Sequence, residues 1–102
     1  MKGTAKQITW AEEIRHNVLA SFGKAIEDIK NSDAPEEIKT ANIAGCVKRV
    51  DALTAAEYAG DVINLFKDIR FTGDNATDFP KVMAVYRVTR PNTPGERAIL
   101  CK

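Results

Sequence analysis

Side chains that commonly do acid–base or metal chemistry are scarce in this sequence. His16 is its single histidine, and the residues one helical turn before it, Glu12 and Glu13, do not complete a set of metal ligands. Adjacent acids on a helix point about 100° apart, so neighbouring carboxylates do not form a catalytic pair by themselves. The sequence also lacks a phosphate-binding glycine loop, a nucleophile elbow and a His-Glu-x-x-His motif. We therefore expect no catalytic residue, no metal site and no cofactor, and thus no enzyme.

The two cysteines and the apolar segments bear on the compartment of the protein. Cys46 and Cys101 lie far apart in the sequence, which is typical of free thiols in a reducing compartment rather than of a zinc site or a disulfide framework. No apolar run reaches the length of about 18 residues that a membrane-spanning helix needs. Residues 1–6 lead into an amphipathic segment without an apolar signal-peptide block. The sequence predicts a cytoplasmic protein.

The charge is unevenly distributed along the chain. Residues 1–78 carry ten basic and thirteen acidic side chains, whereas residues 79–102 carry five basic and one acidic, within a total net charge of +1. Basic residues interleaved with an aromatic ring can follow a phosphate backbone or stack on a base. The same residues could instead dock on an acidic protein surface or lie beside the chain's own acidic helices. The candidates for nucleic-acid or acidic-surface binding are Lys81, Tyr86, Arg87, Arg90 and Arg97.

A second candidate surface lies near the N-terminus, where Lys6, Trp10 and Arg15 could form a partner-binding patch. Tryptophan and arginine are favoured at binding hot spots because one buries a large ring and the other makes forked hydrogen bonds. Alternatively, Trp10 closes the edge of the core and Arg15 pairs with a carboxylate of its own chain. The candidate carboxylates from other helices are Asp51, Asp61 and Asp68.

A long amphipathic helix must position this N-terminal patch. The spacing of Thr4 and Gln7 matches a capping box, in which each side chain bonds the backbone N–H of the other residue. Apolar residues then recur with a period close to 3.6, which predicts a helix over residues 4–31. The apolar residues are Ile8, Ala11, Ile14, Val18, Phe22, Ala25, Ile26 and Ile29.

Two shorter helices are expected next. Residues 31–35 are turn-forming, and Asp33 could cap a helix over residues 35–53. The segment Thr54-Ala55-Ala56-Glu57 repeats the capping-box pattern and predicts a third helix over residues 54–70.

The last thirty residues allow two interpretations. Residues 82–89 are rich in β-branched and aromatic side chains, and residues 91–95 are turn-forming, so the sequence favours a β-hairpin over residues 82–101. Phe79, Val82 and Tyr86 also fit helical spacing, so the alternative is an all-α chain with a fourth helix over residues 79–89. The preferred fold is a single α+β domain over residues 1–102, mainly α, with a three-helix core and a C-terminal hairpin.

The segment from Gly3 to Arg15 resembles one that recurs in small, largely uncharacterised proteins of Gram-positive phages and mobile elements. The shared pattern is Gly, Ser or Thr, any residue, Lys-Gln, two residues, Trp or Tyr, Ala, two residues, Ile-Arg. Members often carry a later Trp-Ile-Asp-Asn-Arg stretch, which has no clear counterpart here. The resemblance implies a bacterial, phage or mobile-element origin and a recurring helical module, and it supplies no activity.

The combined hypothesis is a small non-enzymatic binding or regulatory protein. It would act on a protein partner, and inhibition of a host defence enzyme would fit its implied origin. The alternative is a nucleic-acid-binding accessory protein that uses the basic C-terminal segment. The long first helix could also pair with a second copy in a homodimer.

Overall fold

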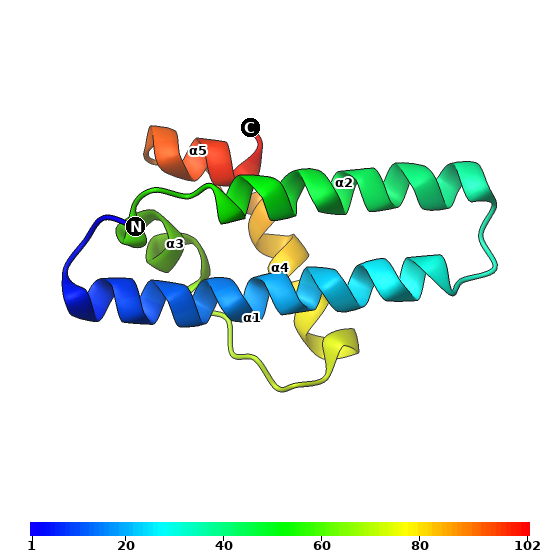
Figure 1. Ribbon diagram of the computed structural model, residues 1–102, viewed down its shortest axis with the longest axis horizontal. Helices are drawn as coiled ribbons and strands as arrows, with labels where there is room; N and C mark the ends of the chain where they lie inside the picture. Colours follow the sequence, from blue (N-terminus) through cyan, green and yellow to red (C-terminus); the bar gives the residue numbers. More distant parts are fainter.

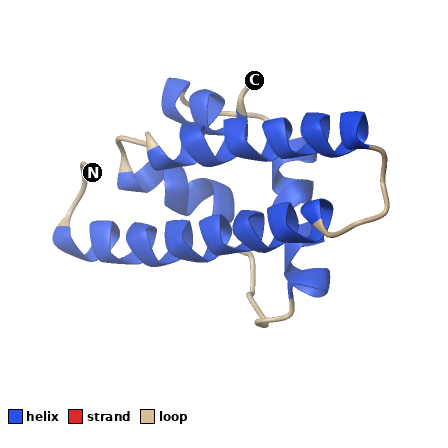
Figure 2. Cartoon of the chain, turned by 45° about the vertical axis from the view of Figure 1, so that its right-hand side comes forward, coloured by secondary structure: helices blue, strands red, loops and turns tan.

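The computed structural model describes all 102 residues, Met1–Lys102, and its regular structure consists of helices alone (Figure 2). The first two helices run antiparallel as a long hairpin, the third and fifth gather toward the end that carries the N-terminus, and the fourth crosses behind the hairpin (Figure 1). None of the helices combines the length and the apolar character needed to cross a bilayer. The helices are α1 (Ala5–Lys30), α2 (Glu36–Thr54), α3 (Ala59–Phe66), α4 (Asn75–Val88) and α5 (Pro94–Leu100).

The α1 helix begins and ends within one residue of its predicted bounds. Its capping box is present: the Gln7 backbone N–H donates to Thr4 Oγ1 over 3.2 Å, and the Thr4 backbone N–H donates to Gln7 Oε1 over 3.0 Å. Val18 and Phe22 are completely buried on the predicted apolar face. Here the cap and the apolar spacing agree, and each marks the same helix.

The second predicted capping box, at Thr54, is wrong. Thr54 is the last residue of α2 rather than the start of a helix, and its hydroxyl donates to the Val50 carbonyl over 2.7 Å. Residues 55–58 form a connection, and α3 begins only at Ala59 and ends at Phe66, so the predicted helix over 54–70 is too long at both ends. The expected cap by Asp33 is also absent, because the residue before α2 is Pro35 and no side chain caps the helix.

The predicted β-hairpin over residues 82–101 is wrong as well, since this segment contains most of α4 and all of α5. The alternative of a helix over residues 79–89 is closer, although α4 begins earlier, where the Asp74 side chain accepts from the Ala76 backbone N–H. Val82 and Tyr86, four residues apart, are both buried on one face of α4. Burial of this face outweighs the β-propensity of the individual residues.

The core lies where α1, α3 and α4 meet, and it is built around aromatic rings. Phe22 lies edge-to-face with both Phe79 and Tyr86, with ring centroids 5.6 Å apart in each pair. Phe66 packs against Tyr86 at 5.7 Å. A single bridge, with the Lys2 backbone N–H donating to the Glu57 carbonyl, ties the N-terminal segment to the connection between α2 and α3.

Candidate functional site

The N-terminal patch is only partly assembled in the structure. Trp10 is 48% exposed and lies at the rim of a hollow of about 240 Å³, whose apolar lining includes Ile14, Phe66 and Phe71. Lys6 is exposed and lies four residues before Trp10, so the two share one side of α1. Trp10 and Lys6 therefore remain candidates for partner contact.

Arg15 does not join this patch. Its guanidinium donates to Glu12 Oε1 over 2.6 Å and to the Thr54 carbonyl over 3.3 Å, and its side chain is 18% exposed. The carboxylate that pairs with Arg15 thus comes from its own helix, and none of the acids expected from other helices is its partner. These contacts draw Arg15 towards the end of α2, away from the hollow beside Trp10.

The basic C-terminal residues do not form the aromatic and cationic surface that the sequence suggested. Tyr86 is 4% exposed and belongs to the core, so its ring is not available to stack on a base. Lys81 and Arg87 are six residues apart on α4, which directs them to different sides of the helix. Lys81 also donates to the Arg70 carbonyl over 3.0 Å. Of the predicted C-terminal binding residues, the exposed arginines are Arg87, Arg90 and Arg97.

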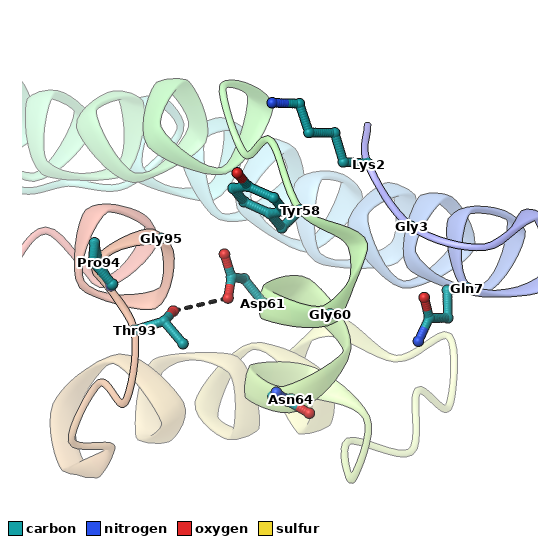
Figure 3. Close-up of a pocket in the computed structure, with 10 residues that line it drawn as sticks. All are labelled: Lys2, Gly3, Gln7, Tyr58, Gly60, Asp61, Asn64, Thr93, Pro94 and Gly95. Atoms are coloured by element: carbon teal, nitrogen blue, oxygen red, sulfur yellow. Dashed lines mark hydrogen bonds between the residues drawn. The ribbon is translucent and has the colours of Figure 1, made fainter.

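A pocket that the sequence analysis did not find lies where the N-terminal segment, α3 and the start of α5 meet. It has a volume of about 760 Å³, and Figure 3 shows its walls, with Tyr58 on one side and Thr93 opposite. Asp61, in the first turn of α3, lies between these two residues (Figure 3). A second hollow of about 420 Å³ shares Tyr58 and Asp61 with the first and continues towards the end of α2.

Asp61 is a buried carboxylate with one oxygen bonded and the other free. Thr93 Oγ1 donates a hydrogen bond to Asp61 Oδ1 over 2.8 Å. Only 7% of Asp61 is exposed. Oδ2 accepts no hydrogen bond and is directed away from Thr93 (Figure 3). A Cβ atom at position 95 would collide with Oδ2, so Gly95 is required for α5 to approach the carboxylate.

A second carboxylate lies on the other side of the Thr93 hydroxyl. Glu96 is 2% exposed, its backbone N–H donates to Thr93 Oγ1 over 2.9 Å, and its Oε2 lies 3.5 Å from that hydroxyl. The three ion pairs of the chain all lie elsewhere. Lys2 lines the pocket, but its ammonium lies over the Tyr58 ring, 5.3 Å from the centroid. Two buried acids therefore share one hydroxyl without a paired cation.

The pocket and the Trp10 hollow are neighbours along the contact between α1 and α3. Gln7 lines the pocket and Trp10 lines the hollow, one turn apart on α1. Asn64 lines the pocket, and Lys67, immediately after α3, lines the hollow. We call this strip, from Asp61 and Gln7 to Trp10 and Lys67, the α1/α3 seam.

Local signals for Asp61 exist in the sequence, but they are weak. The residue stands in the mostly apolar segment Ala59–Phe66, four positions before the buried Leu65, and an acid on a buried helical face is unusual. The partner signal is the Thr93-x-x-Glu96 spacing, which is a capping pattern like that at Thr4. No spacing rule connects the two segments, so their meeting could not be predicted.

The arrangement limits the chemistry of the site. No group of three or more histidine, cysteine, aspartate or glutamate side chains is arranged to hold a metal ion, and His16 is exposed on α1. Comparisons of the chain with protein-family models, with curated proteins and with solved structures find no match. Function must therefore be argued from the site rather than from analogy.

Proposed function

We propose that this chain is a non-enzymatic binding protein that docks a protein partner on the α1/α3 seam. The observation that carries the proposal is the half-exposed Trp10 beside a hollow lined by Ile14, Phe66 and Phe71. Exposed aromatic anchors next to apolar hollows are the usual centres of binding energy in protein interfaces. Lys6, on the same side of α1, would lie at the rim of the contact.

The size of a typical interface supports the use of the whole seam. A stable interface covers about 800 Å² of each partner, which is about one-eighth of the 6381 Å² that this chain exposes. A footprint of that size around Trp10 would reach the neighbouring pocket. The buried position of Tyr86 removes the one aromatic ring that could have stacked on a base beside the basic residues, which leaves less support for a nucleic-acid partner than for a protein.

The resemblance of residues 3–15 to proteins of Gram-positive phages and mobile elements supports a related proposal about the biological setting. In that setting, a small cytoplasmic binding protein could act by covering a surface of a host enzyme, including an enzyme of host defence. Such an inhibitor needs a docking surface, and the half-exposed Trp10 beside its apolar hollow offers one.

The proposal is tested by capture from a lysate of the source cells with matched variants. Trp10→Ala removes the proposed anchor, and Val47→Ala truncates an apolar residue that is 42% exposed on α2, outside the seam. We expect one retained protein to be lost with Trp10→Ala and kept with Val47→Ala, because removal of a hot-spot tryptophan costs about 2 kcal/mol or more. Equal recovery of every protein with both variants would contradict the proposal. Sedimentation of the purified chain would show whether the partner is a second copy.

A further inference from the structure

The Asp61 carboxylate presents an electrostatic problem that the chain does not solve internally. A buried charge is costly unless it is paired and hydrogen-bonded. Asp61 is more than nine-tenths buried, but it receives a single side-chain hydrogen bond, from Thr93, and forms no ion pair. Glu96, on the other side of the same hydroxyl, adds a second acid without a cation. The region is thus short of one positive charge.

The free oxygen of Asp61 is accessible from the pocket. Oδ2 makes no hydrogen bond and is not fully buried, and Asp61 is one of the residues that line the pocket. A Cβ atom on Gly95 would overlap Oδ2, so this oxygen packs directly against the start of α5 on one side. An incoming donor therefore has to approach Oδ2 from the side of the pocket that Tyr58 lines.

The pocket walls fit a flat, delocalised cation. Tyr58 is 49% exposed and presents a ring to the same space, and guanidinium groups stack on aromatic faces while donating in a fork to a carboxylate. Asn64, on the next turn of α3, adds an amide that lines the pocket. The ring already attracts one cation, because the Lys2 ammonium lies over it rather than on Asp61.

We propose that this pocket binds the guanidinium group of an arginine side chain on the protein partner, an inference that rests on the proposed function. The guanidinium donates to Oδ2 of Asp61 and stacks on Tyr58, displacing the Lys2 ammonium from the ring. An apolar side chain of the same partner packs beside Trp10, one helical turn further along the seam. The pocket supplies specificity for charge, and the Trp10 hollow supplies buried apolar area.

The test uses a small probe in place of the unidentified partner. N-acetyl-arginine methylamide is titrated into the ¹⁵N-labelled chain, and the amide signals of Gly60, Asn64 and Gly95 are followed by NMR. A single side chain in an open pocket is expected to bind with a Kd of about 1 mM. The citrulline analogue has nearly the same shape without the charge, and the lysine analogue has the charge without the flat group. We expect saturable shifts with arginine, weaker binding with lysine and none with citrulline.

Three variants test whether Asp61 binds the guanidinium or only stabilises the fold. Asp61→Asn keeps the acceptor for Thr93 and should weaken arginine binding by about tenfold or more, because it removes a charge-assisted bond. Glu96→Gln is the matched control, since it removes a neighbouring buried charge that does not line the pocket. It should change the affinity much less. Lys2→Gln should act in the opposite direction and tighten binding by removing a competing cation.

The proposal is overturned if arginine gives no saturable shift, if citrulline binds as well, or if Asp61→Asn binds as tightly as the wild type. Lysine binding as tight as that of arginine would overturn the choice of a guanidinium. A variant that fails to fold is recognised by the loss of signal dispersion, and Tyr58→Leu, at a half-exposed position, then provides the second comparison. Sedimentation adds one outcome: a dimer that the arginine probe dissociates would place the arginine on a second copy and exclude a separate partner.

These results are independent of the capture experiment on Trp10. If the probe fails but Trp10→Ala still abolishes capture, the arginine pocket is wrong and the docking surface stands. If the probe binds but capture is unaffected by Trp10→Ala, the pocket stands as a guanidinium site and the proposed use of the seam fails.

Discussion

Replacement of Tyr86 by phenylalanine removes a hydroxyl that the fold buries without a hydrogen-bond partner. The ring itself is 4% exposed and packs against Phe22 and Phe66, with centroids 5.6 and 5.7 Å away. A buried hydroxyl left unbonded costs about 1–3 kcal/mol, and Tyr86→Phe keeps the ring while removing that group. We expect the free energy of unfolding at neutral pH to rise by about 1 kcal/mol, which corresponds to about 4–8 °C in Tm for a domain of this size.

The assay is urea unfolding followed by circular dichroism and by the fluorescence of Trp10, the single tryptophan. Tyr58→Phe is the matched control, because Tyr58 is 49% exposed and its hydroxyl can bond to water. This control should change stability by no more than about 0.5 kcal/mol. A loss of more than about 1 kcal/mol with Tyr86→Phe, beside a neutral control, would show that the hydroxyl has a favourable partner and would refute the reasoning.

The pH dependence of the same pair gives a second measurement. Burial raises the pKa of Tyr86 above its ordinary value of 10.0, the Cys101 thiolate raises it further, and Arg49 opposes the shift. The unfolded chain therefore releases this proton first. The stability that depends on the neutral phenol is complete below the unfolded pKa and is lost as the pH rises from about 10 to the folded pKa, by about 1.4 kcal/mol per pH unit. Tyr86→Phe lacks this loss, so parallel stability profiles above pH 10 would contradict the burial.

Three further predictions concern a helix cap, the core and the buried carboxylate of Asp78. Thr4→Ala should lower the free energy of unfolding by about 1 kcal/mol because it removes a real cap, whereas Thr54→Ala should cost less than about 0.5 kcal/mol; urea midpoints of the pair compare them. Phe22→Ala should cost about 3–5 kcal/mol in the same assay, since its fully buried ring contacts two other rings. Burial would raise the pKa of Asp78, but hydrogen bonds from Thr72 and the next backbone N–H lower it below 3.8. The stabilisation that comes from ionised Asp78 is present above that value and is lost as the pH falls through the folded pKa. Asp78→Asn should therefore reduce the fall of the urea midpoint with decreasing pH, measured from about pH 6 to 2.

The sequence predicted the parts of the fold in which local signals agree. The α1 helix has a cap at Thr4 and an apolar face through Val18 and Phe22, and both are local features that survive in the structure. The similar capping pattern at Thr54 is followed just as closely by a buried apolar face, which begins at Ala59, yet Thr54 is the last residue of α2 and caps nothing. A capping pattern alone therefore does not distinguish the start of one helix from the end of the helix before it.

The C-terminal prediction failed because intrinsic propensity and spacing disagreed. Val82 and Tyr86 belong to residue types that favour strands, but they stand four residues apart on one buried face of α4, where the Tyr86 ring meets Phe22 of α1. Pro94 lies in the segment predicted to form a turn, but it occupies the first position of α5, directly after the cap at Thr93. Burial against other helices decides between the hairpin and the helix, and the pattern of one sequence does not show which segments will bury each other.

The candidate pocket exists because residues 94–100 form α5 rather than a strand, and α5 sets the electrostatics of the pocket. Thr93 caps α5 by accepting from the Glu96 backbone N–H, and the same hydroxyl donates its proton to Asp61. A hydroxyl has one proton, so the shorter bond, to Asp61, leaves the Glu96 carboxylate with only a long hydrogen bond from the Asn92 backbone N–H, over 3.4 Å. In a β-hairpin Thr93 would lie in the turn, and nothing would hold its hydroxyl against α3. The negative character of the pocket is therefore a property of the α3 and α5 contact, two segments that are remote in sequence, and it could not be predicted from either segment alone.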